Sequence, residues 1–263
     1  MQIYLNCSTI SNESISRCVN EDLSSIFEWS SRNMLSINIA KTYALFITSS
    51  PYHEELPLLT INGNRLNYAD KATSLGFTIR SNFEWDGYIL QQCGKIYSKL
   101  RTLRLTGHFL SSNIKLKLFK SLILPFFINC DFLLMQASSS TINKLKVALN
   151  SCGRYVFNLG RFDHVSHLQS VLIGCSLENF VKLRCCILIK NIVTTEQPGY
   201  LFTKLTPCRN FRSQKFILPR HHSTKYGNSF FVRGVTIWNS LPNDLTNEPS
   251  RMRFRRKCFE YFG

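Results

Sequence analysis

The chain has 263 residues, of which 44% are hydrophobic and 13% aromatic. A composition this rich in aromatic residues excludes general disorder, and the length is sufficient to bury a sizeable core. The net charge of +16 is unevenly distributed: residues 1–90 carry nine acids and six bases (−3), whereas residues 91–263 carry seven acids and 26 bases (+19). The second segment is therefore a polycation, which is typical of a protein that binds a polyanion.

The ten cysteines and the apolar stretches indicate in which cellular compartment the protein is expected. The chain starts without the basic residues and long apolar run of a signal peptide, and its length removes the need for disulfide staples. We therefore expect reduced, mostly buried thiols in an intracellular protein of the nucleus or cytoplasm that is not secreted. The longest apolar stretch, residues 121–135, contains Pro125, Asn129 and Asp131 and is too short to span a bilayer, so no membrane partner is expected.

The first segment predicts a helix followed by short strands. Asn20, Glu21 and Asp22 favour a helix start there, and an apolar repeat follows to Met34. Alternation over residues 35–39 and the β-prone residues 43–47 then predict strands. Residues 61–64 (Ile-Asn-Gly-Asn) indicate a hairpin turn, and residues 75–79 a further short strand.

From Tyr88 the apolar spacing becomes helical. Helices are predicted over residues 88–103, 114–124, 141–156 and 177–192. The expected fold class is α+β, with three regions: residues 1–87, 88–160 and 161–263. The last region is rich in turns and basic residues.

Several segments, taken in order, resemble the reverse transcriptases of non-LTR (LINE-type, jockey-like) retrotransposons. Residues 18–29 end in a tryptophan, and residues 33–42 read Asn-Met-Leu-Ser-Ile-Asn-Ile-Ala-Lys-Thr, similar to the palm just after the catalytic strand. Leu75, Gly76 and Phe77 resemble the primer-grip hairpin of that family. Residues 238–242 (Trp-Asn-Ser-Leu-Pro) resemble a box near the carboxyl end of many such elements.

The resemblance implies the end of a palm (residues 1–87), a mainly α-helical thumb (88–160) and a basic carboxyl-terminal region. The family's activity is RNA-directed DNA polymerisation with two Mg²⁺ ions held by paired carboxylates. The chain resembles the part after that aspartate pair, so we expect no catalysis by this chain alone and no cofactor in it. Lys41 matches a family lysine near the incoming nucleotide, and without the metal site it is the one weak catalytic candidate.

Other acidic residues do not supply the missing pair. Asp70, in Tyr-Ala-Asp, is followed by Lys71 rather than by a second aspartate. Glu54 and Glu55, like Glu84 and Asp86, have no further ligands at a suitable spacing. We expect no metal site in this chain.

The basic thumb-like segment is the stronger functional signal. Seven cations lie where the family grips the template–primer duplex: Lys95, Lys99, Arg101, Arg104, Lys115, Lys117 and Lys120. Lysine and arginine at such positions neutralise phosphates, which predicts sequence-independent, salt-sensitive binding of RNA, DNA or an RNA–DNA hybrid. A second cationic region comprises Phe211-Arg212, Arg220, Arg233 and the tail Arg251, Arg253, Arg255, Arg256 and Lys257. The tail is also compatible with a solvated helix face or a nuclear-import cluster.

Three alternatives stay open. A zinc site could use His164, His167, Cys175 and the pair Cys185–Cys186, but their gaps are irregular for structural zinc, and His221 with His222 fits a basic loop better. The chain could instead be a protein-interaction module without a nucleic-acid role, with self-association or binding to proteins of the same element. The same cations could also bind a membrane surface, which requires an exposed amphipathic helix.

Overall fold

The computed structural model describes residues 2–7, 10–48, 55–107, 109–208 and 214–263. By its internal contacts the chain divides into two compact units, Met1–Glu84 and Trp85–Gly263. The first boundary expected from the sequence lies three residues further along, after residue 87. The second expected boundary, after residue 160, stays a prediction.

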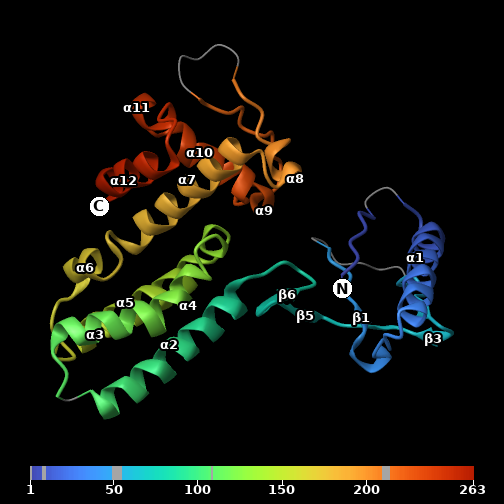
Figure 1. Cartoon of the computed structure of the whole chain (residues 1–263), viewed down its shortest axis with the longest axis horizontal. Coiled ribbons are helices and arrows are strands. Elements are labelled where there is room, and N and C mark those ends of the chain that lie inside the picture. Colours follow the sequence, from blue (N-terminus) through green and yellow to red (C-terminus); the bar gives the residue numbers. More distant parts are fainter. Residues whose placement is uncertain (1, 8–9, 49–54, 108, 209–213) are drawn as a thin grey trace. The chain divides into compact units, whose positions relative to one another are not determined.

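The first unit begins with helix α1 (Asn12–Arg32) (Figure 1). Ser11 is the N-cap, and its Oγ accepts a hydrogen bond from the Ser14 N–H at 3.4 Å. The predicted start at Asn20 was therefore wrong. Asn20 lies inside the helix, where its Oδ1 accepts from the Thr60 N–H at 2.8 Å and its Nδ2 donates to the Leu58 carbonyl at 3.1 Å. A residue type that favours helix starts here attaches a strand to the helix instead.

Six short strands complete the first unit. They are β1 (Tyr43–Ala44), β2 (Thr60–Ile61), β3 (Asn64–Arg65), β4 (Asn67–Tyr68), β5 (Lys71–Ser74) and β6 (Phe77–Arg80). β1 pairs in parallel with β4, whereas β2–β3 and β5–β6 are antiparallel hairpins. The β2–β3 turn at Asn62 and Gly63, with φ of 47° and 74°, confirms the predicted hairpin.

Two strand predictions need correction. Residues 35–39 form no strand, because the Asn38 side chain accepts from the Lys41 N–H and starts the 3₁₀ helix η1 (Ile39–Lys41). Leu75 and Gly76, predicted to start a strand, form the β5–β6 turn with φ of 49° and 84°. Strand β1 also covers only the first two residues of the expected run 43–47. The core of this unit is small and is built on Leu23, Leu59, Ile61 and Leu66.

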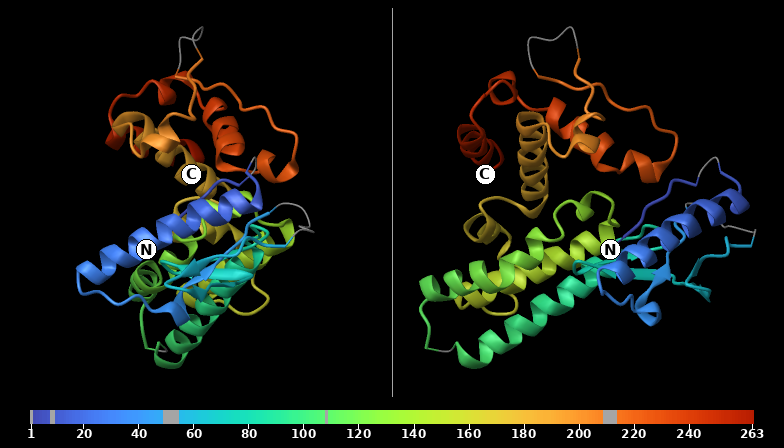
Figure 2. Two further views of the ribbon diagram at one scale, coloured as in Figure 1. Left: turned by 90° about the vertical axis from the view of Figure 1, so that its right-hand side faces the viewer. Right: turned by 45° about the vertical axis from the view of Figure 1, so that its right-hand side comes forward.

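The second unit begins with a layer of helices (Figures 1 and 2). The layer contains α2 (Asp86–Thr106), α3 (Ser112–Leu118), the π-helical turn η2 (Phe119–Ile123), α4 (Leu124–Ile128), the 3₁₀ helix η3 (Leu133–Met135) and α5 (Ser139–Phe157). α2 and α5 pack side by side. They run parallel, because Asp86 bonds to Ser138 at their N-terminal ends and Arg104 to Ser151 further along.

The predicted helix over residues 114–124 is three consecutive segments, α3, η2 and α4. The π turn ends two residues before Pro125, whose missing N–H cannot bond the carbonyl of residue 121, so the regular α pattern is interrupted. Asp86 Oδ1 accepts from the Ser138 N–H at 3.0 Å. Burial raises the pKa of Asp86, but the Ser138 and Thr141 hydrogen bonds and the charge of Lys144 outweigh it, so its pKa lies below the ordinary value.

The rest of the second unit packs around α7 (Leu177–Thr195). The other elements are η4 (Ser166–Leu168), α6 (Gln169–Ile173), α8 (Gly199–Phe202), α9 (Thr224–Gly227), the π turn η5 (Phe230–Gly234), α10 (Val235–Asn239), α11 (Asn243–Thr246) and α12 (Arg251–Phe262). The helices predicted over 141–156 and 177–192 are confirmed as α5 and α7. The predicted α+β class agrees with a mostly helical chain that has few, short strands.

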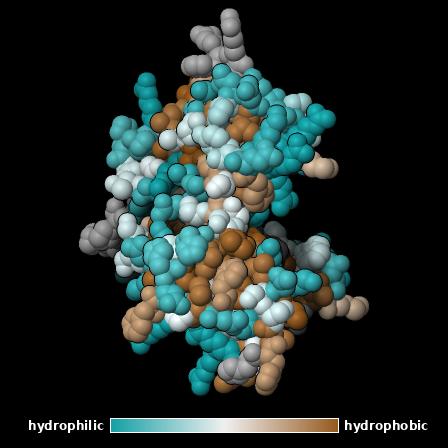
Figure 3. Space-filling view, turned by 90° about the vertical axis from the view of Figure 1, so that its left-hand side faces the viewer, coloured by the Kyte–Doolittle hydropathy of each residue, from teal (hydrophilic) through white to brown (hydrophobic). Residues whose placement is uncertain are grey.

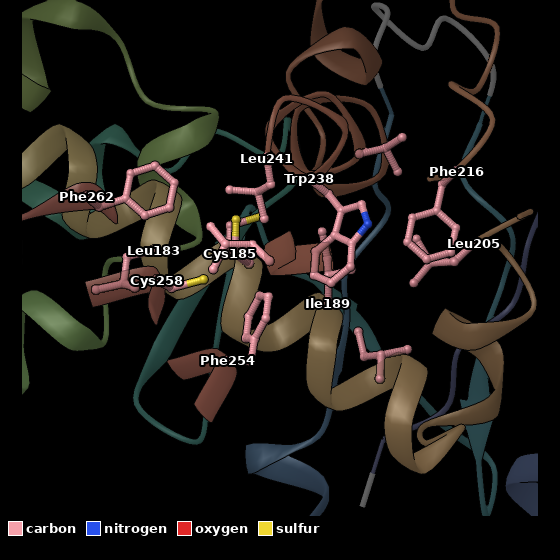
Figure 4. Close-up of a cluster of buried hydrophobic side chains, with 14 of the residues drawn as sticks. Leu183, Cys185, Ile189, Leu205, Phe216, Trp238, Leu241, Phe254, Cys258 and Phe262 are labelled. Carbon is pink, nitrogen blue, oxygen red and sulfur yellow. The ribbon is translucent and has the colours of Figure 1, made fainter. Parts of the chain in front are cut away.

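Trp238 is the largest fully buried side chain and lies at the centre of the α7 core (Figure 4). Its ring stacks on Phe254 of α12 with centroids 5.6 Å apart and contacts Phe216 at 5.9 Å. Its Nε1 donates to the Gln214 carbonyl at 2.6 Å. The box at residues 238–242 therefore fixes the segment before α9 to the helical core. Its Leu241 is buried as well, and its Pro242 precedes α11.

Burial of the cysteines follows the prediction. Seven of the ten are buried, namely Cys93, Cys130, Cys152, Cys175, Cys185, Cys186 and Cys258. Burial raises the pKa of the Cys152, Cys185 and Cys258 thiols to about 12, so these side chains stay protonated at neutral pH. No helix within the described ranges is long and apolar enough to cross a membrane.

Candidate nucleic-acid interface

Six of the seven predicted phosphate-binding cations are exposed on the helical layer of the second unit. They are Lys95, Lys99, Arg101 and Arg104 on α2, Lys117 on α3 and Lys120 in η2. Within the described part of the chain none of the six forms an ion pair with an acidic side chain. No aspartate or glutamate occurs between Asp86 and Asp131. The positive charge of the six exposed cations is therefore available to an anion from solution.

Lys115, the seventh predicted phosphate-binding cation, is buried, so the prediction for this residue was wrong. It is 5% exposed, its Nζ donates to Asn158 Oδ1, and it lies 5.2 Å from the centre of the Tyr155 ring. Lys115 thus joins the start of α3 to the end of α5 and does not face solvent. Its position four residues before the buried Phe119 places both side chains on one helix face, which is the sequence signal that was missed.

The four cations of α2 lie on two sides of the helix. At ~100° per residue, Lys95 and Lys99 are ~40° apart around the axis, and Arg101 is ~160° away from Lys99. The charge of Lys95 lowers the pKa of Cys130, which follows α4, although burial raises that pKa more. Arg104 Nη2 instead reaches the Ser151 carbonyl of α5 at 3.5 Å. The prediction treated these residues as one surface, and the structure separates them into a Lys95/Lys99 side and an Arg101/Arg104 side.

The second cationic region is distributed over several elements. Arg251, Arg253, Arg255 and Arg256 are exposed on α12, whose buried face, Phe254, Cys258 and Phe262, packs on α7. Lys257 donates to Glu248 at 2.6 Å, and Arg256 pairs with Glu260 at 3.6 Å. Arg233 donates to the Met135 carbonyl. Arg220 is exposed, and Phe211 and Arg212 lie outside the described residues.

The palm-like candidates lie on the first unit. Lys41 is exposed at the end of η1. Leu75 is 97% exposed at the β5–β6 turn, followed by Gly76 and the half-buried Phe77. The segment compared with the primer grip thus has the form of a hairpin.

The acidic and metal-ligand candidates are dispersed. Asp70 is exposed between β4 and β5, where its backbone carbonyl accepts from the Ser81 N–H at 3.0 Å, and Glu54 lies outside the described residues. His164 and His167 are exposed and stack at 6.1 Å, whereas Cys175, Cys185 and Cys186 are buried. Within the described ranges no three His, Cys, Asp or Glu side chains come together as metal ligands. The described residues thus do not present the paired carboxylates that two Mg²⁺ ions would need.

Two buried polar features escaped the sequence analysis. Asp131 Oδ2 accepts from Arg184 Nε of α7 at 2.7 Å, and only 3% of the aspartate side chain is exposed. Lys190 is 3% exposed, with its Nζ 5.6 Å from the Phe254 ring centre. Burial lowers the pKa of Lys190, and the negative charge of Glu248 opposes that effect. Both features brace the core rather than form an open site.

Comparisons with protein-family models, with curated proteins and with solved structures gave no match. The reverse-transcriptase resemblance therefore depends on the sequence motifs alone. The structural feature that bears on function is the set of exposed cations of the second unit.

Proposed function

We propose that Trp85–Gly263 binds the phosphates of nucleic acid without sequence preference. The single observation that carries the proposal is the set of six exposed cations on α2, α3 and η2, which form no ion pair within the described residues. Surface lysines and arginines on rigid helices release counterions when they neutralise phosphates, which favours binding. The uneven charge, +19 over residues 91–263, adds a long-range attraction for a polyanion.

We propose further that the chain is a fragment of the non-LTR reverse-transcriptase type. The order of the palm-like, primer-grip-like and Trp-Asn-Ser-Leu-Pro segments supports this origin. The nucleic acid bound would then be a template–primer duplex or one of its strands. The proposal assigns no polymerase chemistry to the chain, because two-metal polymerisation needs paired carboxylates and the motifs found in this sequence supply none.

The α2 cations lie on two sides of the helix, and this arrangement limits which of them a duplex or a single strand can contact. A rigid duplex lying along one side of α2 contacts either Lys95 and Lys99 or Arg101 and Arg104. A flexible single strand can pass around the helix and contact both. Binding of a duplex should therefore depend on one of these two pairs, whereas binding of a single strand should depend on both.

The test is fluorescence anisotropy of the full chain with a labelled duplex of about 20 base pairs over a range of salt concentrations. Four phosphate contacts, from one α2 pair with Lys117 and Lys120, predict a slope of log K against log salt of about −3.6, with the same slope for duplexes of unrelated sequence. A flat salt response would overturn the proposal. So would affinity for one duplex sequence only.

A second candidate function, a protein-interaction module, is favoured by the surface of the first unit. Met34 and Leu75 are each 97% exposed and Trp29 is 58% exposed, while the core cluster has four buried side chains among the described residues of this unit. Exposed apolar side chains over such a small core are typical of a surface that another protein covers. Sedimentation velocity over a range of concentrations tests self-association, which the double variant Met34→Ser/Leu75→Ser should reduce. A monomer at all concentrations would exclude self-association through this surface.

A further inference from the structure

Two phenylalanines are almost completely exposed at one end of the helical layer in the second unit. Phe109, between α2 and α3, is 100% exposed, and Phe162, after α5, is 93% exposed. Leu105 and Ile114, four residues before and five residues after Phe109, are exposed as well. Burying large aromatic rings is strongly favourable, so rings left this exposed indicate a surface that contacts a partner.

The two connections lie at the same end of the layer (Figures 1 and 2). Because α2 and α5 run parallel, their carboxyl ends coincide, and a Cβ on Gly107 would be 2.8 Å from the Tyr155 hydroxyl. The bond from Lys115 Nζ of α3 to Asn158 Oδ1, at the end of α5, joins the two helices that flank these connections. Figure 3 faces this end of the unit and shows apolar side chains among hydrophilic ones. We refer to this region as the Phe109–Phe162 end.

The charge at this end is positive. The Arg161 guanidinium lies 5.8 Å from the centre of the Phe162 ring, and Arg101, Arg104 and Lys117 are exposed on the adjoining helices. The nearby acid is Asp163, whose carboxylate accepts from the Gly160 N–H at 2.6 Å. Exposed rings among cations are the combination that single-stranded nucleic acid requires, since its bases stack on the rings and its phosphates pair with the cations.

We propose that the Phe109–Phe162 end binds unpaired nucleotides by stacking bases on Phe109 and Phe162. This inference rests on the proposed phosphate binding and specifies its substrate class, because duplex bases are not free to stack on protein rings. A membrane surface is the less favoured partner. The apolar side chains here alternate with Ser111, Asn113 and Asp163 and do not form the continuous apolar helix face that interfacial binding needs.

The experiment compares three fluorescein-labelled probes of equal length: a single-stranded oligouridylate, an abasic oligomer with the same number of phosphates, and an RNA–DNA hybrid. The wild-type chain should bind the oligouridylate more tightly than the abasic oligomer. The variant Phe109→Ala/Phe162→Ala should lose about 25-fold or more in affinity for the oligouridylate, since two base–ring stacks are removed. Its affinity for the abasic oligomer and for the hybrid should stay at the wild-type value.

Tyr200→Ala is the matched control, because Tyr200 is a 71% exposed aromatic residue of α8. It should leave all three affinities unchanged. Equal melting temperatures of the variants and the wild type show that the exposed substitutions leave the fold intact.

The outcomes separate this inference from the proposed function. If the wild type binds none of the probes at low salt, the proposed function fails and the inference fails with it. If the wild type binds all three and the double phenylalanine variant binds the oligouridylate equally well, only the stacking inference is overturned. Loss of sedimentation with phosphatidylserine vesicles in that variant, without loss of RNA binding, would also overturn it and identify a membrane contact.

Discussion

The side chain of Asn239 forms two hydrogen bonds with the backbone of Phe216: its Nδ2 donates to the Phe216 carbonyl at 2.8 Å, and its Oδ1 accepts from the Phe216 N–H at 3.0 Å. Trp238, the preceding residue, donates to the Gln214 carbonyl. Adjacent residues of α10 thus hold the segment around Phe216 as a neighbouring strand would. The resemblance to a Trp-Asn-x-Leu-Pro box therefore has a structural explanation that does not involve a ligand.

Asn239→Ala should destabilise the chain by about 2 kcal/mol, because it leaves a half-buried backbone N–H and carbonyl of Phe216 without their partner. Urea denaturation followed by circular dichroism measures the change in the free energy of unfolding. Ser240→Ala is the control, since its exposed hydroxyl bonds only the Ile237 carbonyl of its own helix, and it should change stability by less than about 0.5 kcal/mol. Equal stability of the two variants would show that the Asn239 bonds contribute nothing.

Lys115→Gln should reduce stability and Lys117→Gln should weaken nucleic-acid binding, although the two lysines lie only two residues apart. Lys115→Gln removes the contacts with Asn158 and the Tyr155 ring, so we expect a loss of about 1–2 kcal/mol in the free energy of unfolding and little change in affinity for nucleic acid. Lys117 is exposed, so Lys117→Gln should weaken binding and leave the unfolding free energy unchanged. Thermal unfolding and anisotropy on the same two samples check both effects. Weaker binding by Lys115→Gln at unchanged stability would contradict the structural role.

This difference shows how far the sequence determines the site. Helical spacing predicted α5 and α7 to within a few residues, because their apolar stripes are long and are confirmed as buried faces. It did not distinguish Lys115 from Lys117, since charge alone does not show which lysine shares a face with buried Phe119. The start of α1 was misplaced for a related reason: Asn20 bonds the backbone of the β2 region, a partner 40 residues away along the chain. Long-range polar contacts of this kind leave no local signal.

Paired substitutions should show which side of α2 a duplex contacts. Lys95→Gln/Lys99→Gln and Arg101→Gln/Arg104→Gln each remove two exposed cations from one side of the helix. The pair that contacts a B-form duplex should reduce the magnitude of the salt slope by about 1.8, and the pair on the other side should change it by much less. Arg17→Gln/Arg65→Gln, two exposed arginines of the first unit, is the charge-matched control. Equal, small effects of all three pairs would mean that net charge alone governs binding.

The Glu248–Lys257 pair predicts a pH dependence of stability. The hydrogen bond from Lys257 lowers the pKa of Glu248, and the backbone N–H of Ser250 adds to the effect. A carboxyl whose folded pKa is depressed stabilises the fold above its unfolded pKa, and this contribution is lost as the pH falls through the folded pKa. The wild type should therefore lose stability below about pH 4.5 more steeply than Glu248→Gln.

Urea denaturation at a series of pH values measures this difference. Lys257→Met serves as the reciprocal variant, because it removes the partner that holds the pKa down, and its acid limb should resemble that of Glu248→Gln. The double variant should then add little to either single substitution. Parallel acid limbs for the wild type and Glu248→Gln would refute the predicted role of the pair.

The Asp131–Arg184 ion pair joins the turn after α4 to α7, and its aspartate is almost completely buried. Burial raises the pKa of Asp131 although Arg184 acts against it, so the ionised carboxylate depends on that partner. Asp131→Ala leaves the guanidinium, which is 30% exposed, and the Phe132 N–H without their acceptor, and should cost about 3 kcal/mol. Replacing both charged residues, as in Asp131→Ala/Arg184→Met, removes the uncompensated charge, and the double variant should be more stable than Asp131→Ala alone. Urea denaturation of the wild type, the single variants Asp131→Ala and Arg184→Met, and the double variant completes a double-mutant cycle. Strictly additive losses would show that the two side chains are not energetically coupled.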